Sequence, residues 1–104
     1  MKSKQDYLKA NLKMSFCLSH FQINQNSFIR VFGEETKKDE FEWHMDERKR
    51  NVYVVYADEN WQFQNDNQIP KKIKTGDAFT IEKEFYHRII PGVGRAVIYI
   101  EEDC

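Results

Sequence analysis

The centre of the chain reads Trp43-His-Met-Asp-Glu-Arg-Lys-Arg-Asn-Val-Tyr-Val-Val-Tyr-Ala-Asp-Glu-Asn-Trp-Gln-Phe-Gln64. The first residues of this stretch have a period of two, which places His44 and Asp46 on the same side of an extended segment. The β-branched and aromatic run at 52–56 then predicts a strand, and a polar turn leads from it into a second alternating segment. Short strands separated by polar turns therefore predict an all-β fold class.

The same pattern continues in both directions along the chain. Further strands are expected at Phe16–Ile23, Ser27–Phe32, Ala78–Ile81, Tyr86–Ile90 and Ala96–Ile100. About eight short strands at this spacing are typical of a sandwich or barrel and argue against alternating strands and helices. One short amphipathic helix is expected at residues 4–13. We therefore expect an N-terminal helical extension at residues 1–14 and one β-barrel domain at residues 15–104.

Composition excludes several classes of protein. The chain has 104 residues, 40% of them hydrophobic, which suits one folded domain and not a disordered chain. Its formal net charge is −1, so there is no general excess of positive charge to bind nucleic acid or an anionic membrane. No run approaches the ~20 apolar residues that span a bilayer, and Cys17 and Cys104 form no disulfide framework. These features predict a cytoplasmic protein with reduced thiols.

Residues 43–99 carry two motifs. The first is His44-Met45-Asp46, followed after three residues by Arg50 and a Val-Tyr-Val-Val strand, and the second runs from Gly76-Asp77 through a strand to His87. In order and spacing these motifs resemble those of the cupin superfamily. The resemblance implies an all-β fold, a single cupin-like jelly-roll barrel, with a pocket where the two motifs meet. The chain also resembles short cupin-like proteins of tailed bacteriophages.

The motifs depart from the cupin pattern at several positions. Asp46 stands where a second histidine is common, Arg50 stands where a glutamate ligand is common, and Glu82 and Glu84 replace a proline and a glycine. Two of the four usual metal ligands are therefore unchanged. A guanidinium at the glutamate position is expected to weaken cation binding.

The resemblance leaves three interpretations of the pocket, one of which is a buried structural network that binds no ligand. In the first, His44, Asp46 and His87 are a facial set of ligands for Fe, Mn, Zn or Ni, and the protein is a metal-dependent oxygenase or isomerase. Tyr53 or Glu82 would then supply acid–base chemistry, although the sequence assigns no catalytic residue.

In the second interpretation, Arg50 pairs with Asp46 and the pocket holds no metal. His44, Arg50, Tyr53 and His87 then bind a small polar or anionic ligand, such as a nucleotide or a host signalling metabolite, and Trp61 stacks on it. The direction of Arg50 separates these two interpretations.

A third function class needs neither metal nor ligand. The barrel would present a surface to a partner, as a non-catalytic dimeric interaction protein, and a homodimer is what the resemblance to cupins implies. Arg88 would lie on the opposite face of its strand from His87, at the surface or at a dimer interface.

Overall fold

The computed structural model describes residues 20–103. The predicted helix at residues 4–13, the first part of the predicted strand Phe16–Ile23, and both cysteines lie outside these residues. Within them, no helix is long and apolar enough to cross a membrane.

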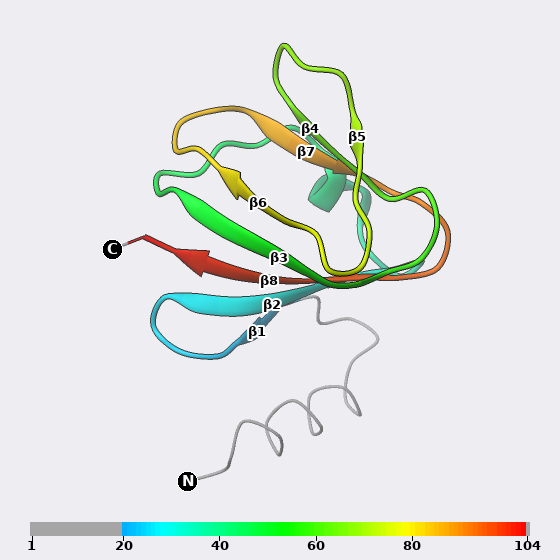
Figure 1. Cartoon of the computed structure of the whole chain (residues 1–104), viewed down its shortest axis with the longest axis horizontal. Helices are drawn as coiled ribbons and strands as arrows, with labels where there is room; N and C mark the ends of the chain where they lie inside the picture. The colour runs from blue at the N-terminus through cyan, green and yellow to red at the C-terminus, as the bar shows by residue number, and fades with distance from the viewer. Residues whose placement is uncertain (1–19, 104) are drawn as a thin grey trace, which may run out of the picture.

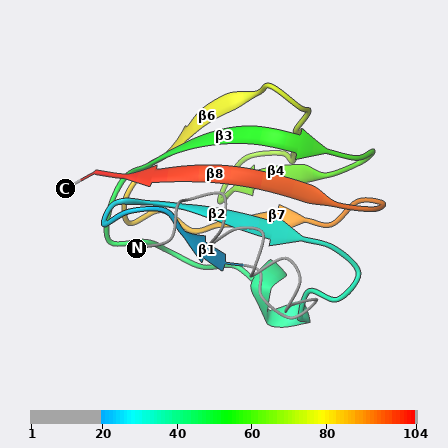
Figure 2. The same cartoon turned by 90° about the horizontal axis from the view of Figure 1, so that it is seen from below.

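Two facing antiparallel sheets make up the described fold (Figures 1 and 2). The larger sheet has the strand order β1-β2-β8-β3-β6 and the smaller has the order β5-β4-β7. The elements are β1 (His20–Gln22), β2 (Ser27–Phe32), the 3-10 helix η1 (Lys38–Phe41), β3 (Arg50–Ala57), β4 (Gln62–Asn65), β5 (Lys71–Lys72), β6 (Ala78–Ile81), β7 (His87–Ile90) and β8 (Ala96–Glu102). The expected all-β barrel-like architecture is therefore confirmed.

Alternation along the central strands builds the core between the sheets. Val52 and Val54 on β3, and Ile98 and Ile100 on β8, point inward and are at most 3% exposed. Their neighbour Tyr53 points outward and is 48% exposed. Each aliphatic side chain buried in this way contributes roughly 1.5–3 kcal/mol to folding.

The period of two from Phe41 to Asp46 predicts one extended strand over residues 41–46, and the structure differs there. Instead of a continuous strand, η1 ends at Phe41, and the only strand-like pairing of the following residues is an isolated bridge between His44 and His87. Two residues of a polar connection, Lys71–Lys72, form the short strand β5 instead. The sequence prediction of strand number was close because these two differences offset each other.

The turn that precedes β8 packs tightly against the turn that follows β3. The Val93 amide donates to the Glu59 carbonyl at 2.9 Å, and the Trp61 indole Nε1 donates to the Val93 carbonyl at 2.9 Å. A Cβ atom at Gly92 would lie 2.3 Å from the Glu59 carbonyl oxygen and 2.5 Å from the Trp61 amide nitrogen. Only glycine permits this approach, because backbone atoms cannot move aside as a flexible side chain does.

We therefore expect Gly92→Ala to lower the free energy of unfolding by about 2 kcal/mol, measured by urea denaturation. Gly33→Ala is the matched control. The nearest neighbour of its Cβ would be the carboxylate end of Glu35, at 3.3 Å, which can swing away, and Arg95 Cγ and the Gly94 carbonyl oxygen would lie at ordinary contact distances of 3.6 and 4.0 Å, so the effect should stay within about 0.5 kcal/mol. Equal losses in both variants would contradict the argument.

Candidate functional site

Three backbone hydrogen bonds join the segments that carry the two motifs, and in one of them the Glu84 amide donates to the Asp46 carbonyl at 2.8 Å. The His44 amide donates to the His87 carbonyl at 3.0 Å, and the His87 amide donates to the His44 carbonyl at 2.9 Å. This pairing fixes residues 43–46 against β7 at the rim of the smaller sheet. The predicted halves of the pocket therefore lie side by side.

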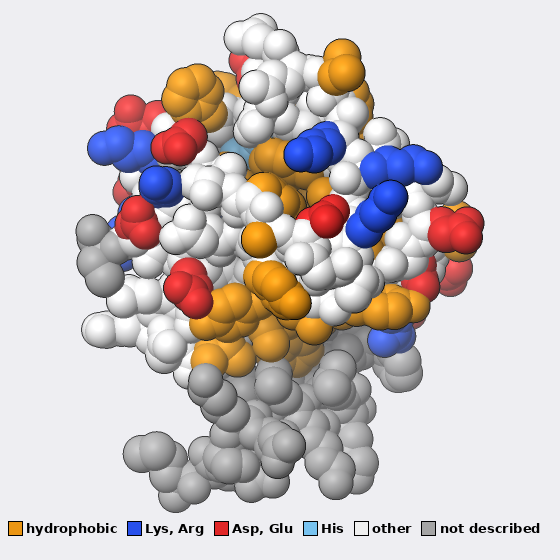
Figure 3. Space-filling model, in the orientation of Figure 1, with side chains coloured by type: hydrophobic (Ala, Val, Ile, Leu, Met, Phe, Trp, Pro, Cys, Tyr) orange, Lys and Arg blue, Asp and Glu red, His pale blue; other side chains and the backbone are white. Residues whose placement is uncertain are grey.

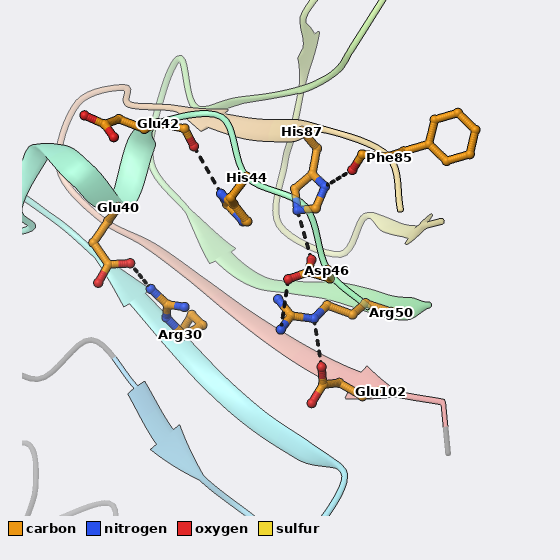
Figure 4. A network of polar contacts seen from close by, with 9 residues as sticks. All are labelled: Arg30, Glu40, Glu42, His44, Asp46, Arg50, Phe85, His87 and Glu102. Carbon is orange, nitrogen blue, oxygen red and sulfur yellow. Dashed lines mark hydrogen bonds and ion pairs between the residues drawn. The ribbon is translucent and has the colours of Figure 1, made fainter. Parts of the chain in front are cut away.

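His44, Asp46 and His87 converge on one point (Figure 4). One potential ligand atom from each lies within 4.8 Å of the others. His87 is buried, Asp46 is partly buried and His44 is exposed. The group thus has a protein-lined side at His87 and a solvent-facing side at His44.

Backbone carbonyls orient both imidazole rings. Nδ1 of His44 lies 3.1 Å from the Glu42 carbonyl oxygen, and Nδ1 of His87 lies 3.0 Å from the Phe85 carbonyl oxygen. A carbonyl oxygen can only accept, so Nδ1 carries the proton in each ring and Nε2 of the neutral ring keeps its lone pair. Metal-binding histidines in proteins commonly have this arrangement.

The contact between His87 and Asp46 is the least ordinary feature of the site. His87 Nε2 lies 3.1 Å from Asp46 Oδ2, but the two atoms are not aligned as a hydrogen bond. Both are buried, and neither has a hydrogen-bond partner within residues 20–103. Two facing lone pairs at this distance repel each other, so the contact requires a positive species, either a proton or a metal ion.

Arg50 lies on the other side of Asp46. Its Nη2 is 3.3 Å from Asp46 Oδ1 and its Nε donates to Glu102 Oε2 at 3.1 Å. The guanidinium also lies over the Phe28 ring, 5.3 Å from the centroid. Arg50 therefore holds one carboxylate oxygen of Asp46 and leaves the other directed at His87.

The pairing of Arg50 changes the electrostatic expectation for the site. The sequence predicted that its charge would oppose a cation, but the Asp46 and Glu102 carboxylates together outweigh that charge. With neutral imidazoles, the cluster carries one net negative charge, which favours a cation over an anion.

The same contacts shift the ionisation of Asp46. Burial raises the pKa of this carboxyl, but an N–H at His87 Nε2, the proton that the contact requires when no metal is bound, and the Arg50 guanidinium act in the opposite direction, so the pKa lies below its ordinary value of 3.8. Asp46 is therefore ionised at neutral pH, as a metal ligand must be.

The three residues line a cavity of about 250 Å³ between the two sheets. Its walls are mainly apolar, with Val52 and Ile100 on the larger sheet and Phe63 and Ile89 on the smaller sheet. Ligand pockets typically measure roughly 300–1,000 Å³, so this cavity suits a small ligand.

Charged residues from two other elements complete the cavity lining. Arg30 on β2 pairs with Glu40 of η1 (Figure 4), and Asp39, which precedes Glu40 in the chain, also lines the cavity. Arg30 was detectable in the sequence, because it is a charged residue at the inward position between Phe28 and Phe32. Glu102 was not detectable from the sequence, because its position beside Arg50 depends on the pairing of β3 with β8.

Three residues that the sequence placed at the pocket do not line it. Tyr53 points to the outer face of β3, and Glu82 is exposed in the turn after β6. Trp61 is 1% exposed and packs against Phe32 and Phe41 in the core. The predicted ligand contacts of Tyr53 and Trp61, and the acid–base roles of Tyr53 and Glu82, are therefore corrected.

Arg88 lies where the strand period placed it. It occupies the opposite face of β7 from His87, donates to Gln64 Oε1 at 2.9 Å, and stacks over the Trp43 ring at 4.6 Å from the centroid. These contacts give Arg88 a structural role beside the site.

No protein-family model and no curated protein sequence matches the chain, but solved structures do. Protein NMB1881 from Neisseria meningitidis has a TM-score of 0.63 and 14% identity over 99% of each chain. A cupin-2 domain containing protein from Shewanella frigidimarina has a TM-score of 0.62 and 14% identity over 99% of this chain and 95% of that one. Fe(II)-HppE has a TM-score of 0.51 and 15% identity over 72% of this chain and 40% of its own.

At these identities the likeness concerns the fold alone, and it confirms the fold that the sequence motifs predicted. The narrower likeness to bacteriophage proteins stays a prediction.

Arg50→Gln should lower the free energy of unfolding by roughly 1–3 kcal/mol, because it leaves two neighbouring carboxylates without their cation. The side chains of Arg50 and Glu102 are 18% and 24% exposed, so we expect less than for a fully buried pair. Urea denaturation of Arg50→Gln, Glu102→Gln and the double variant measures the coupling. If the double variant recovers none of the loss, the repulsion argument is wrong.

Acid should remove the contribution of Asp46 to stability in the metal-free protein. Because the pKa of Asp46 is lower in the folded than in the unfolded chain, the ionised carboxylate stabilises the fold at neutral pH, and this stabilisation is lost as the pH falls below 3.8 through the folded-state pKa. Asp46→Asn should therefore be less stable than the wild type at neutral pH, with the difference disappearing in acid. A difference in unfolding free energy that does not change with pH would contradict this.

Proposed function

The chain has the cupin fold, and from that premise we propose that it is a metal-binding cupin. His44, Asp46 and His87 bind one divalent ion, and a small polar ligand binds at the open positions of that ion inside the cavity. The observation that supports this most strongly is the contact of His87 Nε2 with Asp46 Oδ2 at 3.1 Å, because a cation would satisfy both buried atoms.

The donor set suits a transition metal. Two imidazole nitrogens and one carboxylate oxygen are the ligands of facial triads, which bind Fe(II), and they also suit Mn, Ni or Zn. Three protein ligands leave coordination positions open, and the exposed side of His44 is where solvent reaches the group. A bound ion would act there as a Lewis acid on a ligand atom.

The surrounding residues would hold this donor set in place. The Glu42 and Phe85 carbonyls fix the ring orientations, and Arg50 fixes the Asp46 carboxylate from the side away from His87. Such outer contacts keep ligands in a productive geometry and raise metal affinity. Their presence supports a metal centre over a buried network with no ligand.

Catalysis at the metal site is a further proposal, and it is compatible with the fold. Fe(II)-HppE, by its name an iron protein, has a similar fold over part of its length. A metal-dependent oxygenase or isomerase would need an acid–base group in the cavity. Among the described residues beyond the metal ligands, Asp39 and Glu40 are the carboxylates that line it.

Capture of an anionic metabolite without a metal is a second candidate. It is supported by the presence of both Arg30 and Arg50 in the cavity lining. We rank it below the metal centre because both guanidiniums are ion-paired, Arg30 with Glu40 and Arg50 with Asp46 and Glu102. The cavity volume of about 250 Å³ also favours ligands smaller than a nucleotide, including a host signalling metabolite of that size.

Elemental analysis of protein purified without chelator tests the proposal. We expect one equivalent of a transition metal per chain, with affinity reduced at least about a hundredfold in His87→Ala and Asp46→Asn. His20→Ala is the matched control, because His20 lies on β1 and contacts Gln22 and Phe28, away from the cavity.

Metal affinity should also fall as the pH is lowered, since protons compete for the imidazole nitrogens. Substoichiometric metal that His87→Ala leaves unchanged would contradict the metal centre. Binding of small anions to such metal-free protein, lost in Arg50→Gln, would then support the second candidate.

A further inference from the structure

A second cavity borders the proposed metal cavity. It measures about 290 Å³ and lies between β6, at the edge of the larger sheet, and the β4–β5 hairpin of the smaller sheet. Figure 3 shows a hollow on the face of the molecule where these strands lie, with hydrophobic side chains at its bottom and lysine side chains beside it. We call this second cavity the vestibule.

Two aromatic rings line both cavities and separate them. Phe63 on β4 and Phe79 on β6 belong to opposite sheets, and their ring centroids lie 4.7 Å apart. At this distance the rings are in contact, and because both line each cavity, they form a wall that the two cavities share.

The two rings differ in how firmly they are held. Phe63 is 7% exposed and also packs against the His87 ring, with centroids 5.8 Å apart. Phe79 is partly exposed and lies on a four-residue strand that pairs only with β3 in the described sheet. Rotation of Phe79 would therefore open a passage between the cavities without disturbing a metal ligand.

The vestibule differs from the metal cavity in charge. Lys71 and Lys72 on β5 are exposed at its rim, and its one carboxylate among the described lining residues, Asp77, accepts a hydrogen bond from the Lys74 amide at 2.8 Å. The vestibule is therefore net positive, whereas the metal cavity is net negative. A ligand that reaches from one to the other would carry an anionic group at its outer end.

We propose that the vestibule is an outer binding subsite and that Phe79 is the gate between it and the metal cavity. The site then takes an elongated ligand, with a metal-binding head, an apolar body between the Phe63 and Phe79 rings, and an anionic tail beside Lys71 and Lys72. The inference rests on the proposed function only for the head group, since the two cavities and the gate need no metal.

Methyl NMR with dicarboxylates from malonate to suberate tests the subsite. Isoleucine methyls report on the two cavities separately, Ile100 in the metal cavity and Ile69 in the vestibule, while Val55 on the outer surface is a control. With metal-loaded protein, we expect malonate to shift Ile100 alone and suberate to shift Ile100 and Ile69. If no member of the series shifts Ile69, the subsite does not exist.

Two variants test the gate and the charge. Phe79→Ala should speed suberate exchange roughly two- to tenfold, the range expected from loss of one aromatic contact, with malonate exchange unchanged. Tyr53→Ala is the aromatic control on the outer face, and Phe79→Leu keeps apolar volume if Phe79→Ala does not fold. The double variant Lys71→Ala/Lys72→Ala should lower the affinity for suberate roughly two- to tenfold more than the affinity for malonate.

The same titration on metal-free protein separates this inference from the proposed function. Suberate that still shifts Ile69 and Ile100 in protein unable to bind metal would support the subsite while the metal function fails. Metal binding at the three ligands, with suberate exchange unaffected by Phe79→Ala, would overturn the gate while the metal function stands.

Discussion

The pair of backbone hydrogen bonds between His44 and His87 is the constraint on which the site depends. Residues 42–47 belong to no regular strand, so these two bonds, together with the bond from the Glu84 amide to the Asp46 carbonyl, hold the segment in place beside β7. Once the bridge forms, the period of two carries Asp46 to the same side as His44 and opposite His87 Nε2. The geometry of the candidate site is thus a consequence of these main-chain contacts and of the ion pair between Arg50 and Asp46.

Charge then decides what the site can hold. From the sequence, the charge of Arg50 was expected to weaken cation binding. In the structure its guanidinium lies between two carboxylates, so the cluster stays negative, and it holds one oxygen of Asp46 while the other faces His87. A charged residue at a ligand position is therefore not a sign of a lost metal site by itself. Its partners, not its own sign, determine the local potential.

The sequence predicted the strands from local periodicity, and the resemblance of its two motifs to those of cupins implied that His44, Asp46 and His87 converge. It could not place Glu102, since that residue meets Arg50 only through the register of β3 with β8. Trp61 was misplaced because its burial depends on the turn at Val93, which is far from it in the chain.

The misplacement of Tyr53 has a different cause. Alternation from an inward Arg50 already puts Tyr53 outside, so the same periodicity argument, applied along β3, would have excluded it from the pocket.

The two tryptophans lie in opposite environments. Trp61 is sealed in the core with its indole bonded to a backbone carbonyl, whereas Trp43 is 40% exposed, lies next to His44 in the chain and stacks under Arg88. The molecule therefore contains two built-in optical probes. The emission of buried Trp61 is blue-shifted in the folded protein and shifts to the red when the core is lost. The emission of exposed Trp43 instead reports rearrangement at the rim of the site while the core stays intact.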